Sequence, residues 1–291
     1  MVREITAKTI LSRGSHGPDP WFGVLFGMNL YRGCQHRCIY CDSRSECYGI
    51  DTFDTDVLVK ANAIELLRAE LSRKRVKGTI GTGAMNDPYM PLEETANQTG
   101  QALAVIAEFG FPVHVITKSA LVIRDTDILK RIARIYAAVS FTVTTADDSL
   151  ARKLEPGASA PSARFRAMKT LAAAGIYTGV TMMPVLPFVE DTAENVRAIV
   201  ATAADCGASY VIPCFGMTLR DRQRAYYYAQ FDRLFPGVRQ KYEARFGGNY
   251  EAMSPHAREL GDVFEQECAA RGVATKMRMY QPCEGTQTTL W

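Results

Sequence analysis

Cysteines are concentrated in one short stretch: four of the chain's eight lie in GCQHRCIYCDSRSECY, residues 33–48. Cys34, Cys38 and Cys41 have the spacing C-x-x-x-C-x-x-C, and Cys47 follows six residues later. Three thiolates on one tight loop can bind three irons of a [4Fe-4S] cube and leave the fourth iron open to another ligand. The alternative is a zinc site completed by Cys47 or His36, since zinc favours sets of four thiolate and imidazole ligands. The spacing favours the cluster.

The composition is that of a globular protein and does not point to a membrane or a polyanion by charge alone. The 291 residues are 47% hydrophobic, and 34 basic against 31 acidic residues leave a net charge of only +3. Arg3, Glu4 and Lys8 lie where a signal peptide needs apolar residues, and no apolar run is long enough to span a bilayer. We therefore expect a cytoplasmic protein with no membrane partner. In a reducing compartment, clustered cysteines more often bind metal or act in catalysis than form disulfides.

Short runs rich in β-branched residues alternate with amphipathic stretches, which predicts a parallel sheet with helical crossovers. The predicted strands are residues 26–30, 77–83, 112–118, 137–143, 177–184 and 210–215. The predicted helices between them are residues 58–72, 95–109, 125–134, 161–174 and 192–206. Six strands are fewer than the eight of a complete barrel. The sequence therefore predicts an α/β fold, a partial (β/α)6 barrel of the TIM type that is open rather than closed.

Beyond the sixth predicted strand the pattern is helical. Residues 220–235 and 256–272 predict helices that cover one end or side of the barrel. We expect residues 1–25 to form an N-terminal extension, residues 26–217 the partial barrel, and residues 218–291 a C-terminal helical extension of the same domain. The cysteine loop comes after the first strand, at the carboxyl ends of the strands, where such folds carry their chemistry.

The cysteine loop, with the aromatic Tyr40 directly before its last ligand, resembles that of the radical S-adenosylmethionine (SAM) superfamily. More narrowly, NLYRGCQHRCIYC, MNDPYMPLEE, VITKS and LEPGASAPSARF look like the spore photoproduct lyase-related branch, often labelled DNA repair photolyase-like. The resemblance extends from about Asn29 to Pro187. It identifies cofactors better than a substrate, because most of that branch has no assigned reaction.

The resemblance implies a [4Fe-4S] cluster whose open iron chelates the amino and carboxylate groups of SAM. One electron, from a donor such as flavodoxin or ferredoxin, then leads to cleavage of SAM into methionine and a 5'-deoxyadenosyl radical, which abstracts hydrogen from the substrate. The cofactors carry the difficult chemistry and the protein orients them. A nucleic-acid lesion is one expected substrate class, and a small molecule or peptide is the alternative. A redox sensor, or a zinc module without catalysis, is the alternative from another class.

The resemblance also implies contacts to SAM. Tyr40 would contact the adenine, Gly81 and Gly83 would bring backbone acceptors to the methionine amino group, and Lys118 and Thr142 would contact carboxylate and ribose. Each has a structural alternative: a packing aromatic, turn glycines, or a solvated lysine.

Other residues near the strand ends have two interpretations. Asp87 and Tyr89, on the rim after the second strand, face either cofactor or substrate, or belong to a hydrogen-bond network. Glu155 and Arg164 pair near the mouth of the barrel or form a structural ion pair. Spore photoproduct lyase-like chains have a hydrogen-donating cysteine after the second strand, and this chain has none in GTGAMND. Cys214 is a substitute donor if it points into the barrel, or else a small buried apolar residue.

The C-terminal part gives hints about partners. Arg220, Arg222 and Arg224, interleaved with tyrosines 226–228, suit phosphate contact and base stacking, or simple helix packing. The final residues QTTLW have the Q-x-x-L-aromatic spacing of tails that dock on the bacterial sliding clamp, or else fold back over the barrel mouth. No role is predicted for Cys283.

Overall fold

The computed structural model describes residues 1–14, 17–50, 53 and 56–282. Within them, a seven-stranded sheet has the order β10-β9-β8-β7-β6-β3-β2. Its strands are β2 (Leu11–Arg13), β3 (Val24–Met28), β6 (Thr79–Thr82), β7 (Val113–Thr117), β8 (Ala137–Thr142), β9 (Tyr177–Met182) and β10 (Tyr210–Pro213). Within this sheet the strands β3, β6, β7, β8, β9 and β10 run parallel to one another, and β2 runs antiparallel to β3. The sheet is the open, partial barrel that the sequence predicts.

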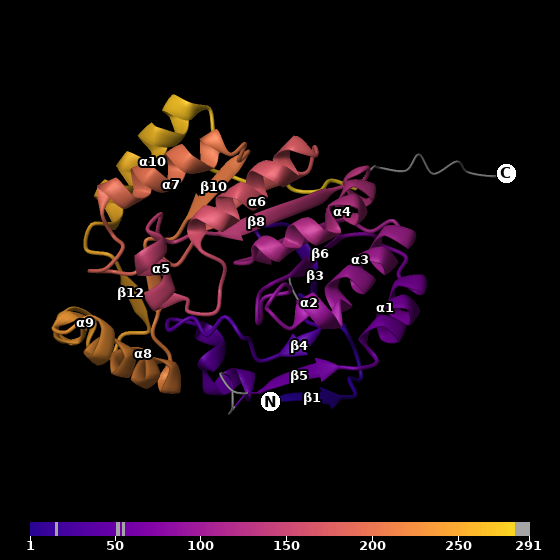
Figure 1. Ribbon diagram of the computed structural model, residues 1–291, viewed down its shortest axis with the longest axis horizontal. Helices are drawn as coiled ribbons and strands as arrows, with labels where there is room; N and C mark the ends of the chain where they lie inside the picture. Colours follow the sequence, from indigo (N-terminus) through magenta and orange to yellow (C-terminus); the bar gives the residue numbers. More distant parts are fainter. Residues whose placement is uncertain (15–16, 51–52, 54–55, 283–291) are drawn as a thin grey trace.

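One layer of helices follows the sheet along its outer side (Figure 1). The layer contains α1 (Ala63–Ser72), α3 (Gln98–Glu108), α4 (Thr126–Ala133), α6 (Pro161–Ala173) and α7 (Ala193–Asp205). Leu129 and Ile132 illustrate how these helices are anchored: they lie one turn apart on α4, both are buried, and α4 packs against β8. Every residue of β8 is buried, as expected for a parallel strand covered on both faces.

For two of the predicted helices, the first residues of the predicted range are wrong. The sequence predicts one helix over residues 58–72, but β5 (Val57–Lys60) precedes α1 and pairs with β1 (Val2–Ile5) and β4 (Tyr31–Arg32). Val57 and Val59 alternate with partly exposed residues, which is a strand pattern. The helix expected over 95–109 is divided at Asn97, whose φ of 47° separates α2 (Glu93–Ala96) from α3.

The first strand and the C-terminal part also differ from expectation. Strand β3 ends at Met28, and β4 lies between it and the cysteine loop. A helix that the sequence did not predict, α5 (Asp148–Leu154), comes after β8. The strands β11 (Gly216–Thr218) and β12 (Glu251–Met253), also not predicted, form an antiparallel pair.

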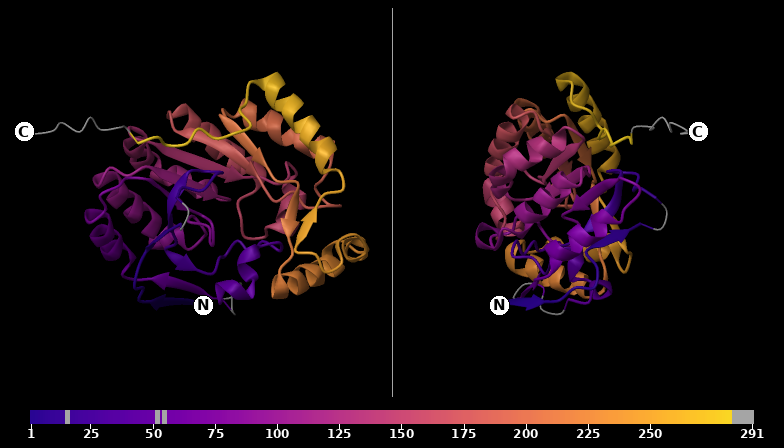
Figure 2. Two further views of the ribbon diagram at one scale, coloured as in Figure 1. Left: turned by 180° about the vertical axis from the view of Figure 1, so that it is seen from behind. Right: turned by 90° about the vertical axis from the view of Figure 1, so that its right-hand side faces the viewer.

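The C-terminal helices do not form one cover. The predicted helix over 256–272 is α10 (Ala257–Arg271), which packs on α7 as part of the outer layer. The helices α8 (Asp221–Leu234) and α9 (Val238–Phe246) lie apart from it, and α8 contacts the turn Asp42–Arg44 of the cysteine stretch. Figure 2 shows this separation from behind and from the side. Cys283 and the QTTLW tail lie outside the described residues. Among the described residues, no helix combines the length and apolarity needed to cross a membrane.

Candidate active site

The cysteine loop is attached to the end of α5 by main-chain hydrogen bonds. Ile39 N–H donates to the Leu154 carbonyl at 2.9 Å, and Gly157 N–H donates to the His36 carbonyl at 2.9 Å. Cys34 and Cys38 are 8% and 6% exposed, and Cys41 is partly buried. These bonds join a loop near the N-terminus to a segment more than a hundred residues later, so the end of α5 and the turn beyond it fix the position of the thiols.

The three cysteines line one cavity together with the ends of three neighbouring strands. Gly83, Asp87, Lys118 and Thr142 line the same cavity. The structure therefore brings together most of the residues that the sequence predicts. Gly81 and Tyr89 are not among the lining residues, and Tyr40 and Cys214 line an adjoining cavity instead.

The thiols of this cavity are protonated when no metal is bound, and a metal ion would replace their protons. Burial raises the pKa of Cys34 to about 12 and raises that of Cys38 well above its usual value. Lys118 opposes the shift at Cys38, because its positive charge favours the thiolate. Iron bound here would do the same more strongly, since metal binding replaces the thiol protons. Three cysteine ligands with access to an open cavity are the donor set of a cube with one free iron.

The zinc alternative would use His36 or Cys47, and both have other contacts. His36 Nδ1 lies 3.3 Å from an Asp87 carboxylate oxygen, and the Cys47 sulfur accepts a hydrogen bond of 3.3 Å from Arg220. In the part of the chain that the structure describes, no group of three or more His, Cys, Asp or Glu side chains is arranged to hold a single metal ion.

Asp87 connects the cysteine loop to strand β7. Its carboxylate accepts hydrogen bonds from Thr117 Oγ1 at 2.7 Å and from the Lys118 N–H at 2.6 Å. Its own N–H points at the Cys34 sulfur, 3.5 Å away. Burial opposes ionisation of Asp87, yet its pKa falls to about 2 because His36 and these donors stabilise the carboxylate. Asp87 therefore lies on the cavity wall and connects the cysteine loop to β7.

Of the other predicted residues of this segment, Tyr89 and Gly81 do not line the cavity, whereas Gly83 does. Tyr89 is fully buried, and its hydroxyl donates to Asp125 at 2.9 Å. A Cβ on Gly81 would meet Val24 at 2.6 Å, so packing against β3 requires this glycine. Gly83 has a φ of 101°, and a Cβ there would lie 2.1 Å from the Ile116 carbonyl oxygen. The Gly83 backbone can therefore turn at the cavity edge where a larger residue could not.

A buried network fixes Tyr40. The Tyr40 hydroxyl donates to Glu155, and Glu155 pairs with Arg164. Arg164 also donates to the Thr142 carbonyl at 2.8 Å, which joins α6 to the end of β8. Burial opposes the charge on Glu155, but Arg164 and Lys118 lower its pKa. The Lys118 ammonium lies 5.7 Å from the centre of the Tyr40 ring, so both side chains border the same space.

A second cavity of about 400 Å³ adjoins the first. Cys41, Ser43, Ala84 and Lys118 line both cavities. The second one continues to Cys214, after β10, and to Glu251 and two methionines, Met217 and Met253, of β11 and β12. Burial raises the pKa of Cys214, which keeps its sulfur as a thiol at neutral pH. Sequence reasoning found Cys214 but missed Glu251, because no motif marks β12.

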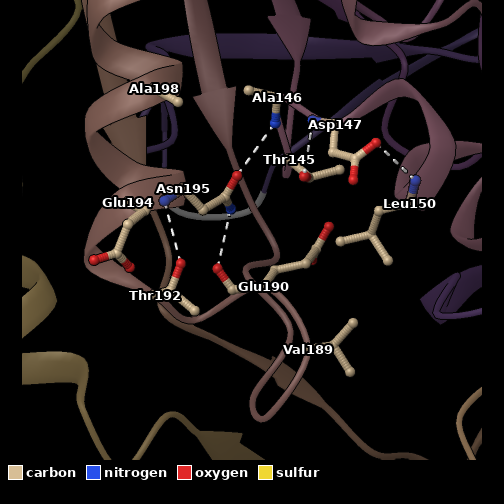
Figure 3. Close-up of a pocket in the computed structure, with 10 residues that line it drawn as sticks. All are labelled: Thr145, Ala146, Asp147, Leu150, Val189, Glu190, Thr192, Glu194, Asn195 and Ala198. Carbon is tan, nitrogen blue, oxygen red and sulfur yellow. Dashed lines mark hydrogen bonds between the residues drawn. The ribbon is translucent and has the colours of Figure 1, made fainter.

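A third pocket lies apart from the predicted residues, between α5 and the start of α7 (Figure 3). Asn195 donates to the Glu190 carbonyl at 3.0 Å and accepts from Ala146 N–H at 3.2 Å, so its side chain links two of the segments that line the pocket. The Glu190 carboxylate accepts from Thr144 at 2.6 Å and is 1% exposed. Burial raises its pKa to about 8. Its bonds tie the loop after β9 to the end of β8.

The three arginines that the sequence suggests for phosphate contact form hydrogen bonds and ion pairs with other groups of the same chain. Arg220 pairs with Asp42 at 2.8 Å. Arg222 donates to the Arg44 carbonyl at 2.6 Å, and Arg224 donates to the Asn249 carbonyl at 2.6 Å. Of the tyrosines beside them, Tyr227 and Tyr228 are buried. These contacts are those of the helix-packing alternative.

Comparisons with known proteins agree with this arrangement. The family model described as the radical SAM superfamily matches residues 28–199. An uncharacterized protein of Mycobacterium tuberculosis is 30% identical over 243 residues, which cover 81% of this chain and 71% of that protein. The radical SAM Nalpha-GlyT isomerase of Pseudomonas phage M6 is 28% identical over 204 residues, 70% of this chain and 42% of the isomerase. Spore photoproduct lyase, solved with a dinucleoside spore photoproduct, superposes with a TM-score of 0.68 at 14% identity over 92% of this chain and 79% of the lyase.

Proposed function

The chain belongs to the radical SAM superfamily, so a [4Fe-4S] cluster and SAM are its cofactors, and we propose that Cys34, Cys38 and Cys41 bind the cluster for hydrogen abstraction from an organic substrate. When bound, these cofactors supply a 5'-deoxyadenosyl radical. The observation that carries the proposal is the shared cavity, in which the three thiols meet the ends of β6, β7 and β8. The chain's own residues must bind and orient SAM, seat the substrate and exclude water.

The proposed SAM site is formed by residues around the first cavity and by Tyr40, which lines the adjoining cavity beside Lys118. Lys118 provides a partly buried positive charge for a carboxylate, and its pKa is raised, against the effect of burial, by Cys38 and Glu155. Tyr40 provides an aromatic face that Glu155 holds in place. Gly83 and Thr142 provide the remaining edge. Asp87, on the wall of the same cavity, holds Lys118 and the cysteine loop in register.

The substrate site is the second cavity, because it begins at Cys41 and Lys118 and ends at Cys214. After hydrogen abstraction the substrate carries a carbon radical. Cys214 can quench a product radical: its S–H bond breaks homolytically, one hydrogen atom passes to carbon, and a thiyl radical remains on sulfur. Hydrogen from 5'-deoxyadenosine, or an electron and a proton from an external reductant, restores the thiol.

A modified or damaged nucleotide is the substrate class that we propose first. The support is the name of one relative, a radical SAM Nalpha-GlyT isomerase at 28% identity, together with the spore photoproduct lyase fold. The second candidate is a small molecule or peptide with a positively charged group. It is favoured by the acidic side chain of Glu251 on the cavity wall, beside the apolar Met183, Met217 and Met253.

The deciding experiment is isotope transfer. Protein reconstituted without oxygen is incubated with SAM, a reductant and deuterated pools of nucleic acid, peptides or metabolites. We expect deuterium in 5'-deoxyadenosine from one pool, and a Cys214→Ala variant that still abstracts deuterium but forms less product. A protein that binds a cluster yet forms no 5'-deoxyadenosine with any pool would contradict the proposed enzyme and leave the redox-sensor alternative.

A further inference from the structure

A groove lies behind the cysteine loop, on the side away from the two cavities. It is bordered by the loop, α5 and α8, and its lining includes Arg37, Ile39, Arg152, Lys153, Tyr226 and Arg233. No residue that lines it also lines the cluster cavity or the adjoining cavity. The loop therefore separates an inner face, where SAM and substrate are proposed to bind, from an outer face that contains this groove.

The groove is strongly positive. Arg37, Arg152, Lys153 and Arg233 are all exposed, and the groove has no acidic residue among those that line it. None of the four cations forms a salt bridge with another described residue. By contrast, Arg220 at the N-cap of α8 pairs with Asp42 at 2.8 Å, and Arg222 donates to the carbonyls of Arg44 and Ile50. The positive charge of the groove is thus available to a partner.

The groove is lined by the two residues that flank the proposed cluster ligand Cys38 in sequence. Arg37 and Ile39 are the residues immediately before and after Cys38. Arg37 has a φ of 55° and is exposed, whereas its neighbours His36 and Cys38 are buried. The backbone turn thus directs Arg37 to the outer face and the thiol to the inner one. A partner that fills the groove contacts the ligand loop without entering the substrate cavity.

We propose that this groove docks a small acidic electron-transfer protein that carries a flavin or an iron-sulfur group. One electron leaves the reduced group of the partner and enters the cluster, so that the partner is oxidised by one electron and the cluster is reduced by one. Opposite charges steer such partners together and speed their encounter. The inference rests on the proposed function, because it requires a cluster that accepts an electron.

The test compares two pairs of charge reversals in the reconstituted protein. Arg152→Glu with Lys153→Glu changes the groove, and Arg73→Glu with Arg75→Glu makes the same change at exposed positions after α1. Helix α1 lies at the opposite end of the molecule from α5 and α8 (Figures 1 and 2). The probes are a reduced bacterial flavodoxin, a reduced bacterial ferredoxin and dithionite. Stopped-flow absorbance gives the rate of cluster reduction, and titration calorimetry gives the affinity of the oxidised carriers.

We expect the groove variant to be reduced by the protein carriers at least about tenfold more slowly than wild type, with weaker binding, and the control pair to behave like wild type. Dithionite should reduce all three proteins alike, since it needs no docking surface. Equal rates for both variants with the carriers would overturn the proposal. So would a wild-type cluster that dithionite reduces but neither carrier does.

Two further results separate this proposal from its alternatives. A cluster that dithionite reduces without any SAM cleavage contradicts the proposed function but not the docking groove. Loss of single-stranded DNA binding by the groove variant, measured by fluorescence anisotropy, with unchanged reduction by the carriers, would assign the groove to nucleic acid instead.

Discussion

Asp87 is the residue through which the two halves of the candidate site depend on each other. It receives N–H and O–H donors from the end of β7 and lies against His36 of the cysteine loop. A single carboxylate thus joins the cysteine loop to the strand end that carries Lys118. The position of Asp87 after a strand end predicts a rim residue, but sequence alone does not tell whether a side chain there turns outward or back into the core.

The three cysteines of the loop should be separable from the fourth by metal content. Alanine at Cys34, Cys38 or Cys41 should abolish the brown colour of reconstituted protein, whereas Cys47→Ala should keep about four irons per chain. The reason is that Cys47 lies outside the cavity and contacts Arg220. Iron and sulfide assays check this prediction. Equal loss of iron from Cys47→Ala would indicate a site closed by four thiolates.

Lys118 should act on SAM and not on the cluster. Lys118→Ala removes a partly buried charge from the cavity wall and should weaken SAM binding about tenfold to a hundredfold, the usual cost of a hydrogen bond to a charged group. Thr142→Ala should weaken it as well. Equilibrium dialysis measures the affinity, and the visible spectrum reports the cluster. The exposed Lys130, on α4, provides the control. Unchanged affinity in both variants would mean that SAM binds elsewhere.

At the scale of elements, the parallel sheet has polar side chains in its interior. Burying such a group lowers stability unless it forms a hydrogen bond. His114 of β7 is fully buried and shares a 2.7 Å hydrogen bond with Ser140 of β8. Its other ring nitrogen has no hydrogen-bond partner among the described residues. Burial lowers the pKa of His114 to about 3, so the folded protein holds this ring neutral.

The stability of the sheet should therefore depend on pH through His114. The pKa is lower in the folded protein than the ordinary 6.5, so protonation favours the unfolded chain, and stability is lost as the pH falls below 6.5. From pH 7 to pH 5, wild type should lose about 2 kcal/mol more than His114→Gln. Urea unfolding at the two pH values checks this. Parallel losses in both proteins would assign the dependence to other groups.

The pair of Glu155 and Arg164 should be important for stability, since both are almost fully buried. Arg164→Ala leaves the carboxylate without its charge partner and should cost about 3–5 kcal/mol of unfolding free energy. Arg166→Ala, on an exposed position of the same helix, should cost little. Denaturant titration measures the unfolding free energy of the two variants. Similar losses in both would show that the pair of Glu155 and Arg164 does not stabilise the fold.

The elements that sequence could predict are those whose pattern is local. The strands of the parallel sheet and helices such as α6 and α7 appear near their expected residues, because buried apolar periodicity marks them. The errors arise where a partner distant in sequence decides. Val57 and Val59 become a strand because β1 and β4 pair with it. Glu251 reaches the second cavity because β12 pairs with β11, which no local pattern reveals.

At the scale of the molecule, the chain closes the site by bringing the two ends of the fold together. Helix α8 comes after the strands of the large sheet yet lies against the cysteine stretch near the N-terminus (Figure 1). The guanidinium of Arg222 donates to the carbonyls of Arg44, at 2.6 Å, and Ile50, at 3.0 Å. The C-terminal segment is therefore a support of the ligand loop as much as a wall of the second cavity.

Arg222→Ala should loosen this support. Hydrogen bonds from a charged donor are lost, at a cost of about 1.5–3 kcal/mol, and residues 42–50 should exchange their amide hydrogens faster while the strands of the large sheet do not. Hydrogen–deuterium exchange with mass spectrometry measures this. Arg233→Ala, at an exposed position on α8, is the control. Unchanged exchange over residues 42–50 would show that the loop keeps its shape without α8.

The cysteine loop separates two spaces: Cys38 lines the inner cavity, and the neighbouring Arg37 lines the outer groove. Two reactants that approach a catalyst from opposite sides do not exclude each other. A carrier bound as proposed in the outer groove and a substrate bound as proposed in the inner cavity would therefore not compete for space. In steady-state terms, neither reactant should act as a competitive inhibitor of the other.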